Sequence, residues 1–176
     1  MQQSATRPTL IGGRRLPDVI GLGGATAGFL AGAVMVLLSP ILSFLAGVSM
    51  WLPPRLIAAT FLGESVIRET TFAAGPVLTG LVIHMVTSVV LGIIFGIVTH
   101  RILHLTTDFG LPLYVGLAYG LIIFFVAQFI ILPAINPSLA EFTVTPFMAQ
   151  NVIYGLCLGL FYTLVRPQPY TNTLES

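Results

Sequence analysis

The sequence predicts an all-α integral membrane protein: a bundle of four transmembrane helices, with a short interfacial helix between the first and second spans. Of the 176 residues, 56% are apolar and only 7% are charged, whereas about 25% of the residues of a soluble domain are charged. The apolar residues also gather into four long segments. The seven cationic residues, all arginine, leave a net charge of +1, which is too small to attract a nucleic acid. A soluble enzyme, a nucleic-acid-binding protein and a disordered chain are therefore disfavoured.

Four apolar segments have the length that a membrane span requires. A hydrocarbon core is about 30 Å thick, and about 20 helical residues cross it. Within a single transmembrane domain, 1–176, we expect spans at about 19–47, 77–103, 111–134 and 147–165. The first segment is longer than the bilayer requires, so we expect it to tilt, or to kink at Pro40. Pro133 is expected to close the third span.

The distribution of arginine predicts how the spans are oriented. Cytoplasmic segments of membrane proteins carry an excess of Lys and Arg. Five of the seven arginines lie in the two tails and in the connection between spans two and three. The other two, Arg55 and Arg68, lie in the connection between spans one and two. We therefore expect both termini in the cytoplasm.

The long connection between spans one and two predicts an interfacial helix over about 54–69. Trp51 suits the membrane interface, and the prolines after it suit a first helical turn. Glu64 precedes Arg68 by four residues, the favourable order for a helical ion pair. With Arg55, these two residues would form a polar lid, contact a lipid headgroup or a partner, or simply make surface salt bridges. An irregular loop is the alternative to the helix.

The four spans contain a repeated pattern. Spans one and three each have two glycines four residues apart and a later proline; these are Gly28, Gly32 and Pro40, and Gly116, Gly120 and Pro133. Spans two and four each have a polar residue, a small residue and a glycine at steps of four; these are His84, Ser88 and Gly92, and Asn151, Gly155 and Gly159. We therefore expect two pseudo-repeated hairpins related by an axis along the membrane normal, with the interfacial helix inserted into the first.

Glycines four residues apart occur in every span. In lipid, small residues let two helix backbones approach closely, and this contact drives helix association. The candidate packing residues are Gly24, Gly28, Gly32, Gly92, Gly96, Gly116, Gly120, Gly155 and Gly159. These surfaces could join the spans of this chain to one another or to the helices of a partner, and the sequence alone leaves both open.

His84 is the candidate cofactor-binding residue, because ionisable side chains inside a membrane are uncommon and often functional. A neutral imidazole there could ligate haem or chlorophyll or contact a quinone, with Gly80 one turn earlier leaving room for a macrocycle. A proton relay is a further alternative. The structural alternative is a hydrogen bond to a neighbouring helix, for instance to Asn151 across the repeat axis.

His100 and His104 are candidate metal ligands at the end of span two. Two histidines one helical turn apart can share a metal ion, and Asp108, four residues further on, could complete the site. The alternative is that these cations only complement the dipole at a helix C-terminus.

The chain resembles a group of small, uncharacterised bacterial membrane proteins with four predicted spans. The residues that carry the resemblance are Trp51-Leu-Pro-Pro-Arg55-Leu-Ile-Ala, Ile83-His84 with Ser88, Gly92 and Gly96, Tyr119-Gly120-Leu121, Leu132-Pro133, and Tyr154-Gly155 with Gly159. These motifs extend over nearly the whole chain but are of the kind that packs helices. The resemblance implies the inner membrane of a bacterium and adds no catalytic residue.

Three functions agree with these features. The first is a non-catalytic accessory subunit of a larger membrane complex, respiratory or photosynthetic, in contact with other integral membrane subunits and with lipid. The second is a small homo-oligomeric transporter or channel. The third is a subunit that contacts a pigment, haem or quinone through His84. Nucleophilic catalysis is disfavoured because Cys157 lies in an apolar run and the sequence has no motif of paired carboxylates, phosphate binding or zinc proteolysis.

Overall fold

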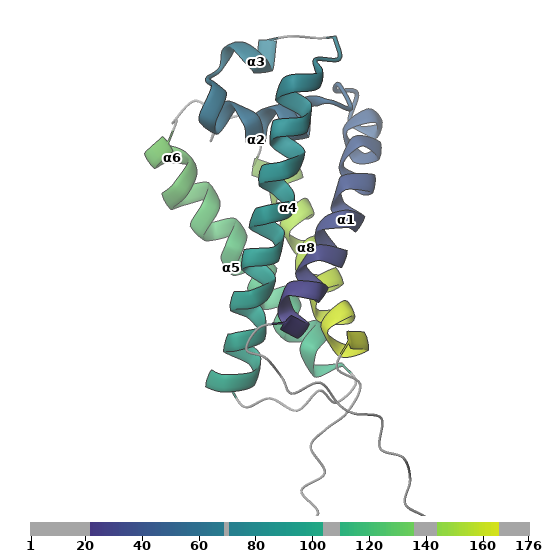
Figure 1. Ribbon diagram of the computed structural model, residues 1–176, viewed down its shortest axis with the longest axis vertical. Helices are drawn as coiled ribbons and strands as arrows, with labels where there is room; N and C mark the ends of the chain where they lie inside the picture. Colours follow the sequence, from purple (N-terminus) through teal and green to yellow (C-terminus); the bar gives the residue numbers. More distant parts are fainter. Residues whose placement is uncertain (1–21, 69–70, 104–109, 136–143, 166–176) are drawn as a thin grey trace, which may run out of the picture.

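The computed structural model describes residues 22–68, 71–103, 110–135 and 144–165, and its elements are all helical (Figure 1). Four stretches are long and apolar enough to cross a membrane: α1 (Leu22–Leu45), α4 (Ala74–Ile97), Leu111–Ile135 and α8 (Val144–Val165). The predicted fold class, an all-α bundle of four apolar helices, is therefore confirmed. A shorter apolar helix, α2 (Leu52–Leu62), lies between the first two of them.

The third stretch is made of three helical segments. It begins as α5 (Leu111–Val126), passes through the π-helical segment η2 (Ala127–Ile131) and ends as α6 (Leu132–Ile135). The helix includes Pro133 and ends two residues after it, at Ile135, so the expected span of about 111–134 agrees with the structure to within one residue. Proline removes one N–H from the ladder of backbone hydrogen bonds, and the π-helical turn just before it changes the spacing of that ladder. In the first span, α1 likewise continues through Pro40 to Leu45.

The contacts between helices give the packing order α4, α1, α8, α5. α1 lies along both α4 and α8, and α5 lies along α8, whereas α4 and α5 make little contact with each other. In Figure 1, α5 leans away from α4 towards the end that carries α6. α1 begins and α8 ends at the opposite end of the bundle from α2 (Figure 1).

The connection between α1 and α4 is not the continuous helix expected over 54–69. It consists of α2 and a single turn, α3 (Ser65–Arg68), and Gly63 separates them. Gly63 has a φ of 84°, which favours glycine, and its N–H donates to the carbonyl of Ala59 at 3.0 Å. This conformation ends α2 and turns the chain.

The buried core has a main cluster between the long helices, in which aromatic and aliphatic side chains mix, and a small aliphatic cluster at α2 and α3. Phe95, Tyr162 and Leu158 belong to the main cluster, together with alanines of α1. A smaller cluster joins Ala59 and Val66 to Leu132 of α6. The second cluster ties the connection helices to the far end of the third span, so α2 and α3 cover one end of the bundle.

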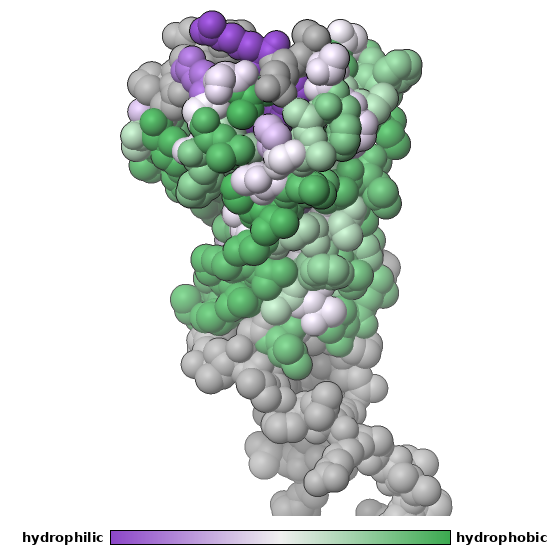
Figure 2. All heavy atoms as spheres, turned by 45° about the horizontal axis from the view of Figure 1, so that its top comes forward, coloured by the Kyte–Doolittle hydropathy of each residue, from purple (hydrophilic) through white to green (hydrophobic). Residues whose placement is uncertain are grey.

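The outer surface is mainly apolar. In Figure 2, hydrophobic side chains cover the visible flank, and hydrophilic ones gather at the end formed by α2 and α3. Glu64 and Arg68 are exposed at that end. A wide apolar flank with a polar end is the surface expected of a chain surrounded by lipid.

Candidate functional site

The first helix pair, α1 and α4, meets backbone to backbone at glycine. A Cβ added to Gly92 would lie 2.7 Å from the Cα of Gly28 and would overlap the carbonyl oxygen of Gly24. A Cβ on Gly32 would lie 2.7 Å from the Cβ of Ser88, and one on Gly96 would lie 3.1 Å from the Cα of Gly24. None of these positions has room for a side chain, so the two backbones can approach this closely only where both have small residues.

The second pair, α5 and α8, meets in the same way. A Cβ on Gly155 would lie 2.9 Å from the Cα of Gly120 and would overlap the carbonyl oxygen of Gly116. A Cβ on Gly159 would lie 3.1 Å from the Cα of Leu113. All nine candidate packing glycines thus face another helix of the same chain.

The contacts of the two pairs correspond residue by residue. Gly28 meets Gly92 as Gly116 meets Gly159. Further along, Gly32 meets Ser88 as Gly120 meets Gly155. These are the same equivalences that the repeated sequence pattern suggests. Each hairpin is therefore built around the same short set of backbone contacts.

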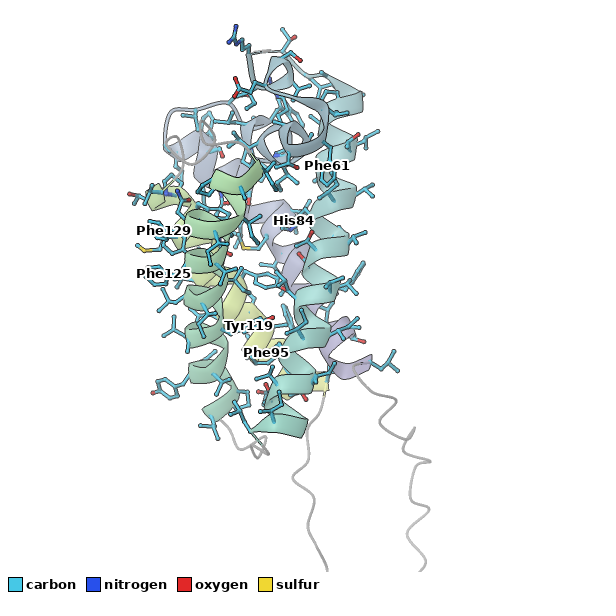
Figure 3. All side chains as sticks on the ribbon, turned by 90° about the vertical axis from the view of Figure 1, so that its left-hand side faces the viewer. Phe61, His84, Phe95, Tyr119, Phe125 and Phe129 are labelled. Atoms are coloured by element: carbon cyan, nitrogen blue, oxygen red, sulfur yellow. The ribbon has the colours of Figure 1, made fainter. Side chains whose placement is uncertain are left out.

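The arrangement departs from that repeat at one edge. The repeat makes α1 equivalent to α5 and α4 equivalent to α8. If the two hairpins were arranged symmetrically, α4 and α5 would therefore pack as closely as α1 and α8 do, but only α1 and α8 are closely packed. The hydroxyl of Tyr119 on α5 donates to the carbonyl of Leu91 on α4 at 2.9 Å, and the ring of Tyr119 lies 5.3 Å from that of Phe95. Figure 3 shows Tyr119 and Phe95 together, further from α2 than His84. We call this side of the bundle the α4–α5 edge.

His84 lies at the α4–α5 edge and bonds to α1. Its Nε2 is 3.2 Å from the carbonyl oxygen of Gly32. A carbonyl oxygen only accepts, so Nε2 carries the hydrogen and Nδ1 of the neutral ring is an acceptor. The structural alternative, a hydrogen bond to a neighbouring helix, is therefore confirmed, but the partner is Gly32 and not Asn151. The Nδ2 of Asn151 donates to the carbonyl of Phe147 in its own helix at 2.8 Å.

The space beside Gly80 is filled. A Cβ on Gly80 would lie 2.9 Å from the Cα of Pro54 and would overlap that residue's carbonyl oxygen. The expectation that Gly80 leaves room for a macrocycle is therefore wrong, because α2 docks there. Nε2 of His84 is also engaged by Gly32, so a tetrapyrrole metal would have to bind Nδ1 without the space that Gly80 was expected to supply.

The candidate metal ligands fall largely outside the described residues. His100 belongs to the π-helical segment η1 (Val98–Ile102), but its side chain is outside the described residues, as is the whole of His104. Asp108 is also outside them. Within the described part of the chain, no three His, Cys, Asp or Glu residues are grouped so as to hold a metal ion. The metal site remains a prediction.

The candidate interfacial residues do not form one surface. Arg55 is 1% exposed, and its guanidinium donates from Nε to the carbonyl of Trp51 at 3.2 Å and from Nη2 to the hydroxyl of Ser49 at 3.3 Å. Glu64 and Arg68 are exposed, whereas Trp51 is half-buried and packs edge-on against Phe72. Arg55 therefore binds the turn between α1 and α2 and does not join a polar lid.

Two tyrosines that are not among the predicted site residues, and stand in the sequence only within the motifs of the resemblance, join the hairpins. Besides Tyr119, Tyr154 of α8 donates its hydroxyl to the carbonyl of Ser88 on α4 at 2.8 Å. Both hydroxyls bind backbone carbonyls that already belong to a helix. A tyrosine within a span was the available signal, because a buried Tyr O–H needs a partner.

Comparisons with family models, curated proteins and solved structures found no match for this chain. Its class is therefore defined by its own features: an all-helical chain with four helices long and apolar enough to cross a membrane, as in multi-pass membrane proteins. The resemblance to small four-span bacterial membrane proteins remains a prediction.

Proposed function

We propose that the chain is a non-catalytic accessory subunit of a larger integral membrane complex of the respiratory or photosynthetic electron-transfer type. The observation that carries the proposal is the α4–α5 edge, where two helices diverge although the repeat-related helices α1 and α8 are packed. Ile122 and Val126 follow Tyr119 on α5 by three and seven residues, a spacing that places them on the same side of the helix. Their side chains are 58% and 40% exposed. A transmembrane helix of another subunit would cover the side chains of this edge, just as α1 and α8 cover each other's side chains on the opposite side of the bundle.

The packing glycines are not the surface that contacts the partner helix. Because they meet one another within the chain, the surface left for a partner consists of larger apolar side chains. Contact with such a surface in lipid relies on close packing and on the release of lipid. The partner is therefore expected to present a complementary apolar helix.

The experiment is purification of the full chain from its own membranes in a mild detergent, followed by native mass spectrometry. The proposal expects large heterologous membrane subunits to co-purify. Ile122→Trp, on the α4–α5 edge, should reduce their recovery at least tenfold. Leu37→Trp is the matched control because Leu37 is 70% exposed on α1, and it should leave the recovery unchanged.

A homo-oligomeric transporter or channel is the second candidate. The π-helical segment η2 favours it, since π-helical turns often occur at functional sites, and Gln128 within it is buried. Recovery of a lone symmetric oligomer, with no other subunit, would overturn the accessory role in favour of this one.

We further propose that the chain lies in the inner membrane of a bacterium with both termini in the cytoplasm. The arginine distribution supports this orientation. The ends of α1 and α8 that lie nearer the chain termini are at the same end of the bundle (Figure 1), which agrees with termini on one side. A reporter fused at Ser176 should be active only in the cytoplasm, and activity only outside it would reverse the orientation.

A further inference from the structure

We propose that the α4–α5 edge binds an amphiphile that carries a hydroxyl on an apolar body, of the isoprenoid quinol or hydroxylated lipid class, with its hydroxyl donating to Nδ1 of His84. The inference rests on the proposed function only in using the same edge. It is stated for the chain without a partner helix there, because a partner helix and the amphiphile would compete for this edge. Four observations lead to it.

The first observation is the hydrogen bonding of His84. Gly32 takes the hydrogen of Nε2, so Nδ1 of the neutral ring can only accept. No described residue donates to Nδ1, and this atom is not among the fully buried atoms that lack a partner, so it reaches the surface of the bundle. An acceptor at the surface of a span has no water to bind in the hydrocarbon.

The second observation is depth. His84 is ten residues after Ala74, the start of α4, which places it about 15 Å along the helix at a rise of about 1.5 Å per residue. This position is close to the middle of a span about 30 Å thick. Phospholipid headgroups do not reach it, whereas a small hydroxylated head on an apolar body does.

The third observation is a line of α4 residues that faces α5. Residues three or four apart share a face of a helix, and His84, Thr87 and Leu91 follow that spacing. The carbonyl of Leu91 accepts the hydroxyl of Tyr119 from α5, so this face looks towards α5. Thr87 is exposed on it, which sets a second polar group beside His84 at the same edge.

The fourth observation is the contrast with the repeat-related position. Asn151 of α8 is 9% exposed, and its amide donates within its own helix. The carbonyl of Asn151 lies against Gly120 of α5, and α8 is closely packed against both α5 and α1. His84 is only half-buried. It lies on α4, which α5 scarcely contacts, whereas the repeat-related helices α1 and α8 are closely packed. The same fold position is therefore closed in one hairpin and accessible in the other.

The site explains the ligand class by hydrogen-bond type. A quinol or an alcohol donates an O–H to Nδ1, whereas an oxidised quinone has only acceptors and would leave Nδ1 without a donor. An unmade hydrogen bond of this kind costs about tenfold in affinity. The apolar edge beyond Tyr119, including Ile122 and Val126, suits the body of such a molecule.

The test measures binding to the purified full chain in lipid nanodiscs. The probes are decylubiquinol, decylubiquinone and 1-hexadecanol, titrated while the ¹⁵N resonance of His84 Nδ1 and the melting temperature are followed. We expect decylubiquinol to shift the Nδ1 resonance and to bind about tenfold more tightly than decylubiquinone. Binding of decylubiquinol without hexadecanol assigns the site to quinols, and binding of both assigns it to hydroxylated lipids in general.

Two variants make the test specific. His84→Leu removes both ring nitrogens, so it loses the hydrogen bond to Gly32 as well as the acceptor Nδ1. Its melting temperature without ligand measures the first loss, and binding of decylubiquinol about tenfold weaker measures the second. Thr87→Val should bind about threefold more weakly. Thr163→Val is the matched control, because the Thr163 hydroxyl donates to Gly159 in its own helix at 2.9 Å, and it should bind as the unmodified chain does.

Equal binding by the unmodified chain and a folded His84→Leu variant would overturn the inference. So would equal affinity for the quinol and the quinone, or the failure of both hydroxylated probes to bind. None of these results depends on whether other subunits co-purify, so the binding site and the accessory role fail separately.

Discussion

The two hairpins of this bundle are held together alike but surrounded differently. α1 with α4, and α5 with α8, meet at corresponding glycines that leave no room for a Cβ. The first hairpin also carries α2, which docks on α4 where Gly80 meets Pro54. The second contains the π-helical segment η2 and leans away from α4. The comparison teaches that a short set of small residues defines a helix pair, while the larger residues around it decide what that pair exposes.

The largest expected effect tests whether the two glycine contacts are equivalent. Gly92→Ala and Gly159→Ala, at the two positions that the repeat equates, each place a methyl group against backbone that cannot rotate away, with the nearest Cα atoms at 2.7 Å and 3.1 Å. Each should lower the free energy of unfolding in detergent micelles by about 3 kcal/mol. Similar losses would support the equivalence of the hairpins, and a loss in only one would break it.

Gly75→Ala is the matched control for both substitutions. Nothing lies within 4 Å of a Cβ at Gly75, in the first turn of α4. Because alanine is the better helix former, this variant should gain about 0.5–1 kcal/mol. A loss there comparable to that of Gly92→Ala would show that the effect is not one of contact.

The next effect concerns α2, which only the first hairpin carries. Gly80→Ala should push α2 away from α4 while leaving both glycine-paired hairpins intact, at a cost of about 2 kcal/mol. Trp51, the single tryptophan of the chain, directly precedes α2 and packs against Phe72 with ring centroids 4.8 Å apart. Its fluorescence should shift in Gly80→Ala. An unchanged spectrum together with unchanged stability would contradict the docking of α2.

The smallest expected effect on stability comes from removing the tyrosine hydroxyls that bind α4, and it tests what holds α5 at the α4–α5 edge. Tyr119→Phe and Tyr154→Phe each remove one hydroxyl that donates to a carbonyl of α4, and each should cost about 1 kcal/mol. Only Tyr119→Phe should widen the α4–α5 distance, because α8 is also held through α1. Spin labels at Val90 and Ile122, read by pulsed electron paramagnetic resonance, measure that distance. Equal widening in both variants would remove the special role of Tyr119.

Much of the architecture could be predicted from the sequence, because it depends on local and additive properties. Apolar length identifies the four helices, and the steps of four residues single out glycines that the structure places between helices. The third helix ends at Ile135, within one residue of the prediction, but the π-helical turn before Pro133 could not be predicted, because it depends on how the backbone is hydrogen-bonded. The split of the interfacial helix at Gly63 also went unrecognised, although a glycine at φ 84° is a common helix end.

The candidate site was predicted only in part. His84 stands out in the sequence because an imidazole in an apolar segment is costly, but its partner was expected on α8 and lies on α1 at Gly32. Arg55 appeared to belong to an exposed polar face and is buried against the turn before α2. In both cases the partner is a backbone carbonyl, and carbonyls carry no sequence signature.

The sequence by itself determined that this protein suits a lipid environment, how many spans it has, and at which small residues its helices can meet. Hydropathy, segment length and side-chain size are properties of the chain alone. Only the tertiary structure decided which helices use those residues. It also decided that α1 and α8 close while α4 and α5 diverge. The physical reason is that lipid drives no two apolar helices together in preference to any others, so pairing depends on the three-dimensional fit of surfaces. That fit buries Asn151 and leaves the ring of His84 accessible at the edge of the bundle.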